Sequence, residues 1–275
     1  MDYEEIQSIV QDEMQVYFIE NKYAQEQQDA HLFDRRRFVL SIFWLQQLIP
    51  ACERILELGG PSIATHVIQR FYPDKTIAHT KFDLREKFPY PDRSFDLIIN
   101  MEVIEHIFDL DPRQATTLTG VKQALSECHR VLDENGKMFL TTPNACSIWV
   151  IQRALRSEPP LQYDYHFREF TYYEIIGLIK EAGFLIEKAA TERVWHLWDF
   201  TAIEQFIQEN QYSMENRGDD TFVIATKSQD RSQKQSEYSS ILPAHPPAAP
   251  PTELQHTRPG FWGRIKTIKE RRSGD

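Results

Sequence analysis

The sequence predicts an α/β fold built on a mostly parallel sheet. Short apolar runs at residues 54–58, 95–99 and 137–142 read as buried strands, and they alternate with longer segments of helical periodicity. Such alternation is typical of domains in which helices cover both faces of a sheet. The first run ends in glycines and the second is followed by carboxylates. Because ligands of α/β sheets bind beyond the carboxyl ends of the strands, these residues are the first candidates for function.

Composition narrows the class of protein. The 275 residues are 41% hydrophobic, which is enough for one large domain or two small ones. The net charge of −10 disfavours nucleic acid as a partner of the main body, since phosphate neutralisation needs a basic face. The three cysteines show no zinc-ligand spacing. With neither a signal-peptide pattern nor an apolar run of membrane length, we expect a cytoplasmic protein.

Residues 1–50 are predicted to form helices that pack on the sheet. Apolar residues recur at helical spacing over 4–20 and again over 35–49, where Pro50 ends the second helix. The stretch between these two helices is polar and rich in glutamine. We interpret the basic triplet at 35–37 as a solvent-exposed face rather than a phosphate site.

The glycine turn is the first candidate ligand site. A strand at 54–58 leads into Gly59 and Gly60, and a helix can begin at Ser62. This combination binds nucleotides, because glycine lets the backbone approach the ligand closely. A second strand is predicted over 76–83, and Asp83 follows Gly59 by 24 positions. An acid at an interval of ~20 residues binds a ribose hydroxyl in such folds, so Asp83 is a ribose candidate, with a turn aspartate as the alternative.

The end of the central strand is the second candidate site. Glu102, Glu105 and His106 follow the apolar run at 95–99. If the chain turns helical after Asn100, positions i, i+3 and i+4 share one face. Two carboxylates and an imidazole would then point the same way. The segment between Asp83 and this strand is too short for a further helix and strand.

The alternation continues to the end of the folded region. Gly136 and Gly183 are read as the C-terminal caps of the helices before them, and Thr171 with Glu174 as a capping box. The remaining helices are predicted over 121–132, 148–155, 172–182 and 202–208, and the strands over 184–187 and 220–226. Residues 228–257 are rich in Ser, Gln and Pro and are predicted to be a disordered linker.

The final residues, 258–275, differ from the linker. Phe261, Ile265 and Ile268 fall at helical spacing among arginines and lysines. A basic amphipathic segment over 258–272 fits an anionic membrane surface or an acidic protein partner. The alternative is a frayed tail. We therefore expect a protein that is cytoplasmic, with peripheral membrane contact as a further expectation.

Five motifs across residues 53–227 resemble, in order and spacing, those of the class I S-adenosylmethionine-dependent methyltransferases. They are ILELGG at 55–60, FPYPDRSFD at 88–96, EVIEH at 102–106, RVLDENG at 130–136 and TPN at 142–144. The resemblance implies a Rossmann-like sheet over 51–227 with an antiparallel last strand. The short segment after Asp83 implies that the third strand is missing. The glycine motif departs from the family, because Pro61 and Ile63 replace its later glycines.

The resemblance also implies roles for individual residues. S-adenosylmethionine would be the cofactor, with Gly60 compensating for the lost glycines. His106 and His166 are the candidate bases, with Glu105 as the third catalytic candidate, because a neutral imidazole takes a proton near pH 7. The cofactor residues implied are Glu57 and Gly59 for the amino-acid part, Asp83 for the ribose, Leu84 for the adenine, and Asn100, Met101 and Glu102 beside the methyl group.

A metal site is a further hypothesis from resemblance. The set Glu102, Glu105, His106 and His166 is similar to the metal site of small-RNA 3′-terminal 2′-O-methyltransferases, and ubiquinone-pathway O-methyltransferases carry a similar first half. Mg²⁺ or Mn²⁺ would lower the pKa of a substrate hydroxyl. Metal-free relatives share the Glu-x-x-Glu-His pattern, so a site without metal is the alternative.

Three hypotheses of function follow. The first is O-methylation of a small molecule, a sugar or a lipid-linked glycan. The second is a metal-dependent RNA 2′-O-methyltransferase. The third is a catalytically degenerate methyltransferase fold that binds a partner through its basic tail.

Overall fold

The computed structural model describes residues 1–109, 118–195 and 199–228. Its strands are β1 (Arg54–Glu57), β2 (Thr76–His79), β3 (Phe95–Met101), β4 (Leu132–Pro143), β5 (Phe184–Glu192) and β6 (Asp220–Lys227). They form one sheet in the order β2-β1-β3-β4-β6-β5. The first four strands of this order are parallel, and β6 is antiparallel to both β4 and β5. The predicted α/β sheet, with its antiparallel last strand and without a further strand between β2 and β3, is confirmed.

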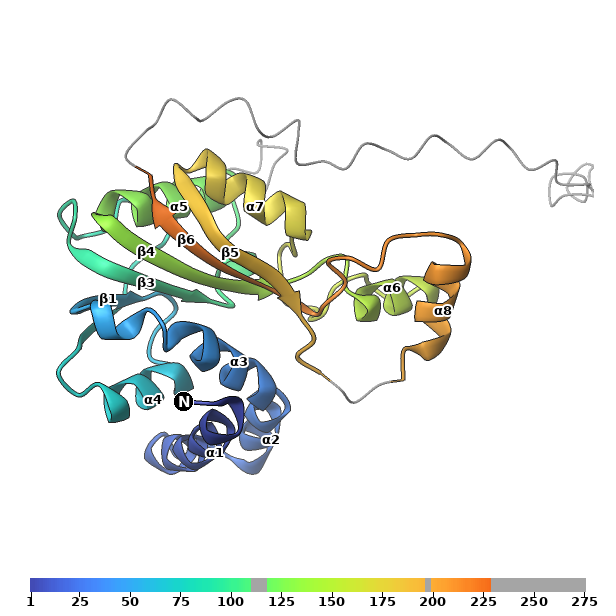
Figure 1. Cartoon of the computed structure of the whole chain (residues 1–275), viewed down its shortest axis with the longest axis horizontal. Helices are drawn as coiled ribbons and strands as arrows, with labels where there is room; N and C mark the ends of the chain where they lie inside the picture. Colours follow the sequence, from blue (N-terminus) through green and yellow to red (C-terminus); the bar gives the residue numbers. More distant parts are fainter. Residues whose placement is uncertain (110–117, 196–198, 229–275) are drawn as a thin grey trace, which may run out of the picture. The chain divides into compact units, whose positions relative to one another are not determined.

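Helices cover both faces of the sheet (Figure 1). They are α1 (Tyr3–Glu20), α2 (Gln25–Phe33), α3 (Arg35–Leu45), α4 (Ile63–Phe71), α5 (Thr119–Val131), α6 (Ile148–Leu155), α7 (Tyr172–Glu181) and α8 (Thr201–Glu209), with short 3₁₀ turns η1 (Ile49–Ala51) and η2 (Ile104–His106). The glutamine-rich stretch contains α2, which the sequence pattern did not indicate. This helix buries none of its residues, so it has no apolar stripe to reveal it.

The apolar residues of each strand divide between two cores. In β3, Leu97 and Ile99 pack with α1, α3 and α4 on one face, and Ile98 packs with α5 and α7 on the other. Successive side chains of a strand point to opposite faces, so one uninterrupted apolar run serves both cores. The N-terminal helices therefore complete one face of the sheet, and they belong to the same compact unit as the strands.

Several element ends differ from the predictions. The helix expected over 35–49 ends at Leu45, before the 3₁₀ turn η1 that contains Pro50, and β5 continues to Glu192 beyond the predicted end at 187. β2 ends at His79, so Asp83 lies beyond the strand rather than at its last residue. Gly136 does not cap α5, because β4 already begins at Leu132 and Gly136 is not in the left-handed region. At the other predicted cap, Gly183 has φ +100° and ends α7 as expected.

The predicted capping box at the start of α7 is half formed. The Thr171 side chain accepts a hydrogen bond from the Glu174 backbone N–H at 3.2 Å. The Glu174 carboxylate pairs with Arg168 instead of returning to the Thr171 backbone. The Thr171 cap therefore satisfies one of the free N–H groups of the first turn without the reciprocal bond.

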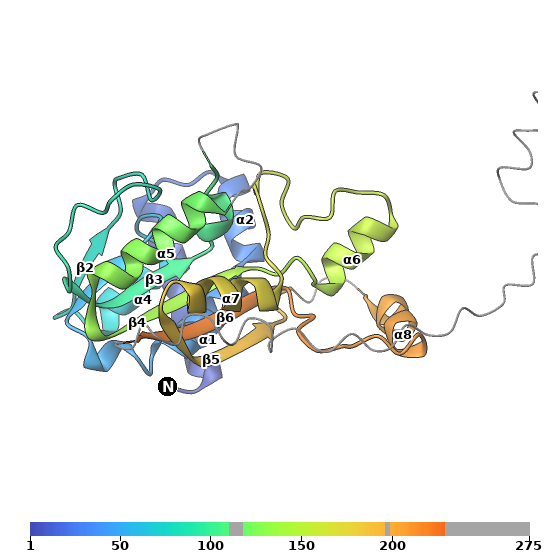
Figure 2. The same cartoon turned by 90° about the horizontal axis from the view of Figure 1, so that it is seen from above.

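A pair of short helices lies beyond the carboxyl-terminal end of β4 (Figure 2). α6 and α8 pack there around Ile148, Phe200 and Ile207. None of the helices in the described residues combines the length and the apolar character that crossing a lipid bilayer takes. The linker predicted over 228–257, apart from Ser228, and the basic tail at 258–275 lie outside the described residues.

Candidate functional site

A pocket of about 200 Å³ lies at the carboxyl ends of β1 and β3. Its walls are the loop after β1, the end of β3 and the N-terminal helices. Five of the residues predicted to bind a cofactor line this pocket, namely Glu57, Gly59, Gly60, Met101 and Glu102. The other three, Asp83, Leu84 and Asn100, are not among its lining residues.

The turn after β1 requires glycine at its first position. Gly59 has φ +88°, and a Cβ added there would meet Val103 Cγ2 at 2.8 Å. Its backbone N–H donates to Thr80 Oγ1 at 2.9 Å. Gly60 has φ +101° but open space around the position of a Cβ. Backbone conformation therefore favours glycine at both positions, whereas close packing restricts only Gly59.

The N-terminal helices supply the opposite wall of the pocket. Tyr17 from α1, His31 from α2 and Phe38 from α3 line it. The Tyr17 hydroxyl donates to the Pro61 carbonyl at 3.3 Å, which joins α1 to the turn after β1. These three residues belong to no local motif, and only the tertiary fold brings them to the site.

Glu57 is buried and already holds protein partners. Its carboxylate accepts hydrogen bonds from the hydroxyls of Ser62 and Thr65 at the start of α4. His79 Nδ1, at the end of β2, lies 3.2 Å from Glu57 Oε2. Glu57 therefore fixes β1, β2 and α4 relative to one another and shapes the pocket from beneath.

Asp83 is bound by its own loop. The Arg85 backbone N–H and guanidinium donate to its carboxylate, the guanidinium at 2.6 to 3.1 Å. The Arg85 side chain, followed by this backbone N–H, lowers the pKa of Asp83 to about 2. His79 and Thr80, not Asp83, lie where β2 ends, and they contact Glu57 and Gly59 of the pocket wall. The spacing that suggested Asp83 assumed a longer strand.

Glu102 leaves β3 in the left-handed region, with φ +53°. Its carboxylate accepts hydrogen bonds from Thr141 Oγ1 at 2.8 Å and from Arg37 Nη1 at 3.0 Å. The predicted helical face that would join Glu102 to Glu105 and His106 does not form, because η2 begins only at Ile104. Glu102 instead faces the N-terminal helices.

Arg37 does not lie on a solvent-exposed face, as was predicted for the basic triplet at 35–37. Only 12% of its side chain is exposed, and it pairs with Asp34 at 2.9 Å and with Glu102 at 3.0 Å. Burial acts to lower the pKa of Arg37, but Glu102, Asp34 and Asp220 outweigh it and raise the pKa. The prediction of a solvent-exposed face was wrong at this position. The reason is that its partner is 65 positions away in sequence.

Asp220, the first residue of β6, is a buried carboxyl group with no hydrogen-bond partner for either oxygen among the described residues. Burial raises its pKa well above the usual range, and the nearby Glu102 adds to this effect. Arg37 acts in the opposite direction. An ionised Asp220 is therefore costly in this structure.

The raised pKa of Asp220 gives a testable dependence of stability on pH. A carboxyl group that binds its proton more tightly in the folded state stabilises the fold at low pH and loses that contribution as pH rises. The Asp220→Asn variant lacks this loss. We therefore expect the difference in the free energy of unfolding, variant minus wild type, to increase as pH rises above about 4. The increase should reach at most about 1.4 kcal/mol per pH unit. Urea unfolding at several pH values measures this, and parallel curves for the two proteins would contradict it.

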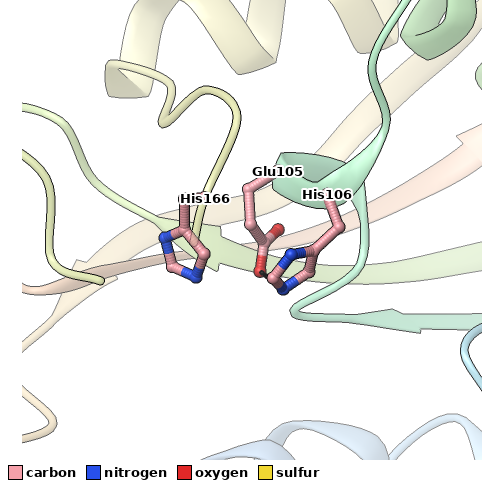
Figure 3. A group of neighbouring side chains, drawn as sticks. All are labelled: Glu105, His106 and His166. Atoms are coloured by element: carbon pink, nitrogen blue, oxygen red, sulfur yellow. Dashed lines mark ion pairs between the residues drawn. The ribbon is translucent and has the colours of Figure 1, made fainter. Parts of the chain in front are cut away.

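Glu105, His106 and His166 form a second group of side chains (Figure 3). One atom from each of the three lies within 4.8 Å of the others. Glu105 is fully buried and accepts a hydrogen bond from Thr142 Oγ1 at 3.0 Å. Its other oxygen lies 3.8 Å from His106 Nε2 and has no hydrogen-bond partner among the described residues.

His166 reaches this group from a separate loop. The Glu105 carbonyl accepts the Phe167 N–H at 3.1 Å, which ties the loop to η2. His166 Nδ1 lies 2.7 Å from Glu169 Oε1. This contact fixes the ring and leaves Nε2 as its second nitrogen. The His106 and His166 rings stand edge to face, with 4.9 Å between their centroids.

The pKa values of His106 and Glu105 are shifted in opposite directions. Burial, and then the neighbouring His166, lower the pKa of His106. Burial, and then the negative charge of Glu102, raise the pKa of Glu105 well above its usual range. The lowered pKa of His106 favours a neutral imidazole that can accept a proton, and the raised pKa of Glu105 favours the protonated form of its carboxyl group.

Residues 63–140 match the model of a protein family described as a methyltransferase domain. The match runs from α4 through most of β4, and so includes the end of β3 and the Glu105–His106 segment. Over this range the chain is similar to a methyltransferase domain. Its sheet order and the pocket after β1 agree with the fold that the five sequence motifs implied.

Curated relatives are similar to about half of this chain. A probable S-adenosylmethionine-dependent methyltransferase of Mycolicibacterium smegmatis is 33% identical over 134 residues, 46% of each chain. One of Mycobacterium tuberculosis is 29% identical over 161 residues, 51% of this chain and 52% of that protein. The chain thus spans about half the length of the curated relatives it matches. A SAM-dependent methyltransferase structure from Archaeoglobus fulgidus has a TM-score of 0.46 at 17% identity, covering 69% of this chain and 94% of that one.

Proposed function

We propose that the chain is an S-adenosylmethionine-dependent methyltransferase that transfers the methyl group to a hydroxyl of a small molecule, a sugar or a lipid-linked glycan. The observation that carries the proposal is the position of the glycine-lined pocket of the methyltransferase domain. Its lining ends at Val103, and the 3₁₀ turn η2 that carries Glu105 and His106 begins at the next residue. One part of the site can hold a cofactor while the other handles the proton of the acceptor.

The residues of the pocket fit the cofactor. Gly59 and Gly60 leave the turn after β1 without side chains, and the space around Gly60 is open, so a ligand can approach the backbone there. Met101 and Glu102 border the same space. S-adenosylmethionine, when bound, supplies a methyl group on a positively charged sulfur. The protein has to position the acceptor and remove its proton.

His106 is the proposed general base. It is neutral near pH 7 and half exposed, so it can take the hydroxyl proton of the acceptor as the oxygen accepts the methyl group. His166, held by Glu169, would position the acceptor or assist in the proton transfer. The buried Glu105 stands behind His106 at 3.8 Å.

Exposed aromatic rings surround the proposed base and support a sugar or glycan acceptor. Tyr165 is 65% exposed, and its ring stacks on that of His106 with 5.6 Å between the ring centroids. Phe167, 56% exposed, packs against Phe108 at 4.4 Å. Such rings offer flat apolar faces on which the carbon–hydrogen faces of a sugar, or an apolar aglycone, can rest.

Methyl transfer tests the proposal directly. The full chain would be incubated with S-adenosylmethionine labelled in its methyl group and with separate pools of sugars, glycolipids and phenols. We expect label in a hydroxyl-bearing product. Label confined to amines or thiols would contradict the O-methyltransferase assignment while leaving methyl transfer intact.

The His106→Asn variant is expected to lower kcat by about 10²- to 10⁴-fold, because the variant retains the shape but cannot accept the proton. In the wild type, the rate should rise with pH through a value below about 6.5, since the base must be neutral. Rates measured from about pH 5 to pH 8 check both statements. A variant with unchanged kcat would exclude His106 as the base.

A metal-dependent reaction is the second candidate, favoured by the convergence of Glu105, His106 and His166. The Glu169–His166 contact resembles the carboxylate–histidine pairs that orient metal-bound imidazoles. Glu102, the fourth ligand suggested by the sequence, is occupied by Arg37 and Thr141. Mg²⁺ or Mn²⁺ held by the other three would lower the pKa of an acceptor hydroxyl, an RNA 2′-hydroxyl being the predicted alternative acceptor.

Binding of Mn²⁺ separates the two candidates. If the metal site exists, the full chain should bind Mn²⁺ in electron paramagnetic resonance titrations, and Glu105→Gln should weaken binding at least about tenfold. Glu181→Gln, on the exposed side of α7, is the matched control. Equal Mn²⁺ binding by the wild type and both variants would contradict the metal site.

The remaining expectations stay predictions. One is a cytoplasmic location. Another is contact of residues 258–272 with a membrane or a protein, and these residues lie outside the described part of the chain. The degenerate, partner-binding alternative differs from the proposed function in one respect that binding can test, because it requires no cofactor.

A further inference from the structure

The pocket proposed for the cofactor has a wall that none of the sequence motifs supplies. Tyr17 from α1, His31 from α2 and Phe38 from α3 line it. All three precede the residues that match the methyltransferase-domain model, which begin at position 63. The N-terminal helices therefore contribute directly to whatever the pocket binds.

The turn after β1 offers few hydrogen-bond donors to a ligand. The backbone N–H groups of Gly59 and Ser62 each donate to a threonine hydroxyl, at 2.9 and 3.3 Å. Pro61 has no N–H to donate. Of the turn residues 59–62, only Gly60 has an N–H that forms no hydrogen bond within the described part of the chain. A carboxylate accepts hydrogen bonds through two oxygens, so this single donor is too few for it.

The side chains that line the pocket leave one further donor. Tyr17, His31 and Ser62 are the lining residues whose side chains can donate a hydrogen bond. The Ser62 hydroxyl donates to the Glu57 carboxylate, and the Tyr17 hydroxyl donates to the Pro61 carbonyl at 3.3 Å. No described residue forms a hydrogen bond with the imidazole of His31. His31 is therefore the lining side chain whose donor is available to a ligand.

Aromatic rings hold the imidazole of His31 in place. Its ring stacks on that of Tyr23, with 5.2 Å between the centroids and 15° between the planes. The rings of Tyr17 and Phe38 lie 6.3 and 6.4 Å from it. Burial lowers the pKa of His31, which favours the neutral ring. A neutral imidazole still carries one N–H, so a hydrogen bond from His31 does not require a charged ring.

The proposed cofactor brings one anionic group, the α-carboxylate of its amino-acid part. A carboxylate that leaves water is costly unless it accepts hydrogen bonds. We propose that His31 binds this carboxylate and so makes the N-terminal helices part of the site that recognises the methyl donor. A hydrogen bond to an ionised acceptor is stronger than one between neutral groups. The inference rests on the proposed function and names a residue that determines its cofactor specificity.

A cofactor analogue without the carboxylate tests the inference. Decarboxylated S-adenosylmethionine retains the adenosine, the sulfonium and the amine. Calorimetry would compare its affinity with that of S-adenosylmethionine for the full wild-type chain and for His31→Phe, which keeps an aromatic ring but has no donor. We expect the variant to bind S-adenosylmethionine at least about tenfold more weakly. Its affinity for the decarboxylated analogue should remain that of the wild type.

His66→Phe is the matched control for this experiment. His66 lies in α4 and packs against the same Tyr17 ring, with 4.9 Å between the centroids, but it does not line the pocket. Its substitution should leave both affinities unchanged. An equal loss of affinity for S-adenosylmethionine in His66→Phe and His31→Phe would contradict the assignment to His31.

The remaining outcomes separate failure of the inference from failure of the proposed function. If His31→Phe binds both ligands more weakly by the same factor, the ring only shapes the pocket and the inference is wrong. If the wild type binds the decarboxylated analogue as tightly as S-adenosylmethionine, the carboxylate is not recognised. This comparison needs no substitution, so it can overturn the inference even if His31→Phe does not fold. If the wild type binds neither ligand, the proposed function itself fails.

Discussion

Replacing Gly59 with alanine is expected to lower affinity for S-adenosylmethionine by about 100-fold or more. The residue has φ +88°, and an added Cβ would approach Val103 Cγ2 to 2.8 Å. The left-handed conformation alone costs a non-glycine residue roughly 1–2 kcal/mol. The clash adds to this cost and displaces either the turn or the end of β3, both of which line the pocket. Calorimetric titration of wild type and variant measures the loss.

Gly60→Ala is the matched control for this substitution. Gly60 has a similar φ of +101° but nothing within 4 Å of an added Cβ. We expect the backbone strain to weaken binding in Gly60→Ala by about tenfold, without the additional steric effect. Equal affinities of the two variants would contradict the claim that the contact between the turn and Val103 shapes the pocket. Thermal unfolding of both variants establishes that they are folded.

Replacing Arg37 with methionine is expected to destabilise the protein by about 3–5 kcal/mol, because it leaves the mostly buried carboxylates of Asp34 and Glu102 without their cation. Methionine retains much of the volume of the side chain, so the effect reports the lost charge rather than a cavity. Urea unfolding near neutral pH measures the change.

Arg35→Met is the comparison for this loss. Arg35 lies in the same basic triplet, but it makes an exposed hydrogen bond to Gln11. Its substitution should cost less than about 1 kcal/mol. If Arg37→Met were no less stable than Arg35→Met, the ion pairs of Arg37 with Asp34 and Glu102 would have no role in holding the N-terminal helices to the sheet.

The fold could be predicted largely from local patterns. The nearly all-apolar run of β3 indicates a strand with two buried faces, and Leu97, Ile98 and Ile99 do divide between the two cores. The same reasoning missed α2, because a helix that buries nothing leaves no periodic signal. It also extended β2 as far as Asp83, since nothing in the sequence marks His79 as its last residue.

The candidate site was less accessible to sequence reasoning. Strand ends located Gly59, Glu102 and His106, because ligands of this fold class bind where strands end. Tyr17 and Arg37 could not be found in this way. Each lies in an amphipathic helix, and its contact with the site depends on how the N-terminal helices pack on the sheet. A motif records neighbours along the chain and not partners across it.

The central claim is that the pocket between the turn after β1 and the N-terminal helices holds S-adenosylmethionine. Calorimetric titration of the full chain with this cofactor tests it most directly. We expect one site with a micromolar dissociation constant, and a loss of detectable heat in Gly59→Ala. The absence of binding by the folded wild-type chain would contradict the account, and would favour a methyltransferase fold that acts without its cofactor.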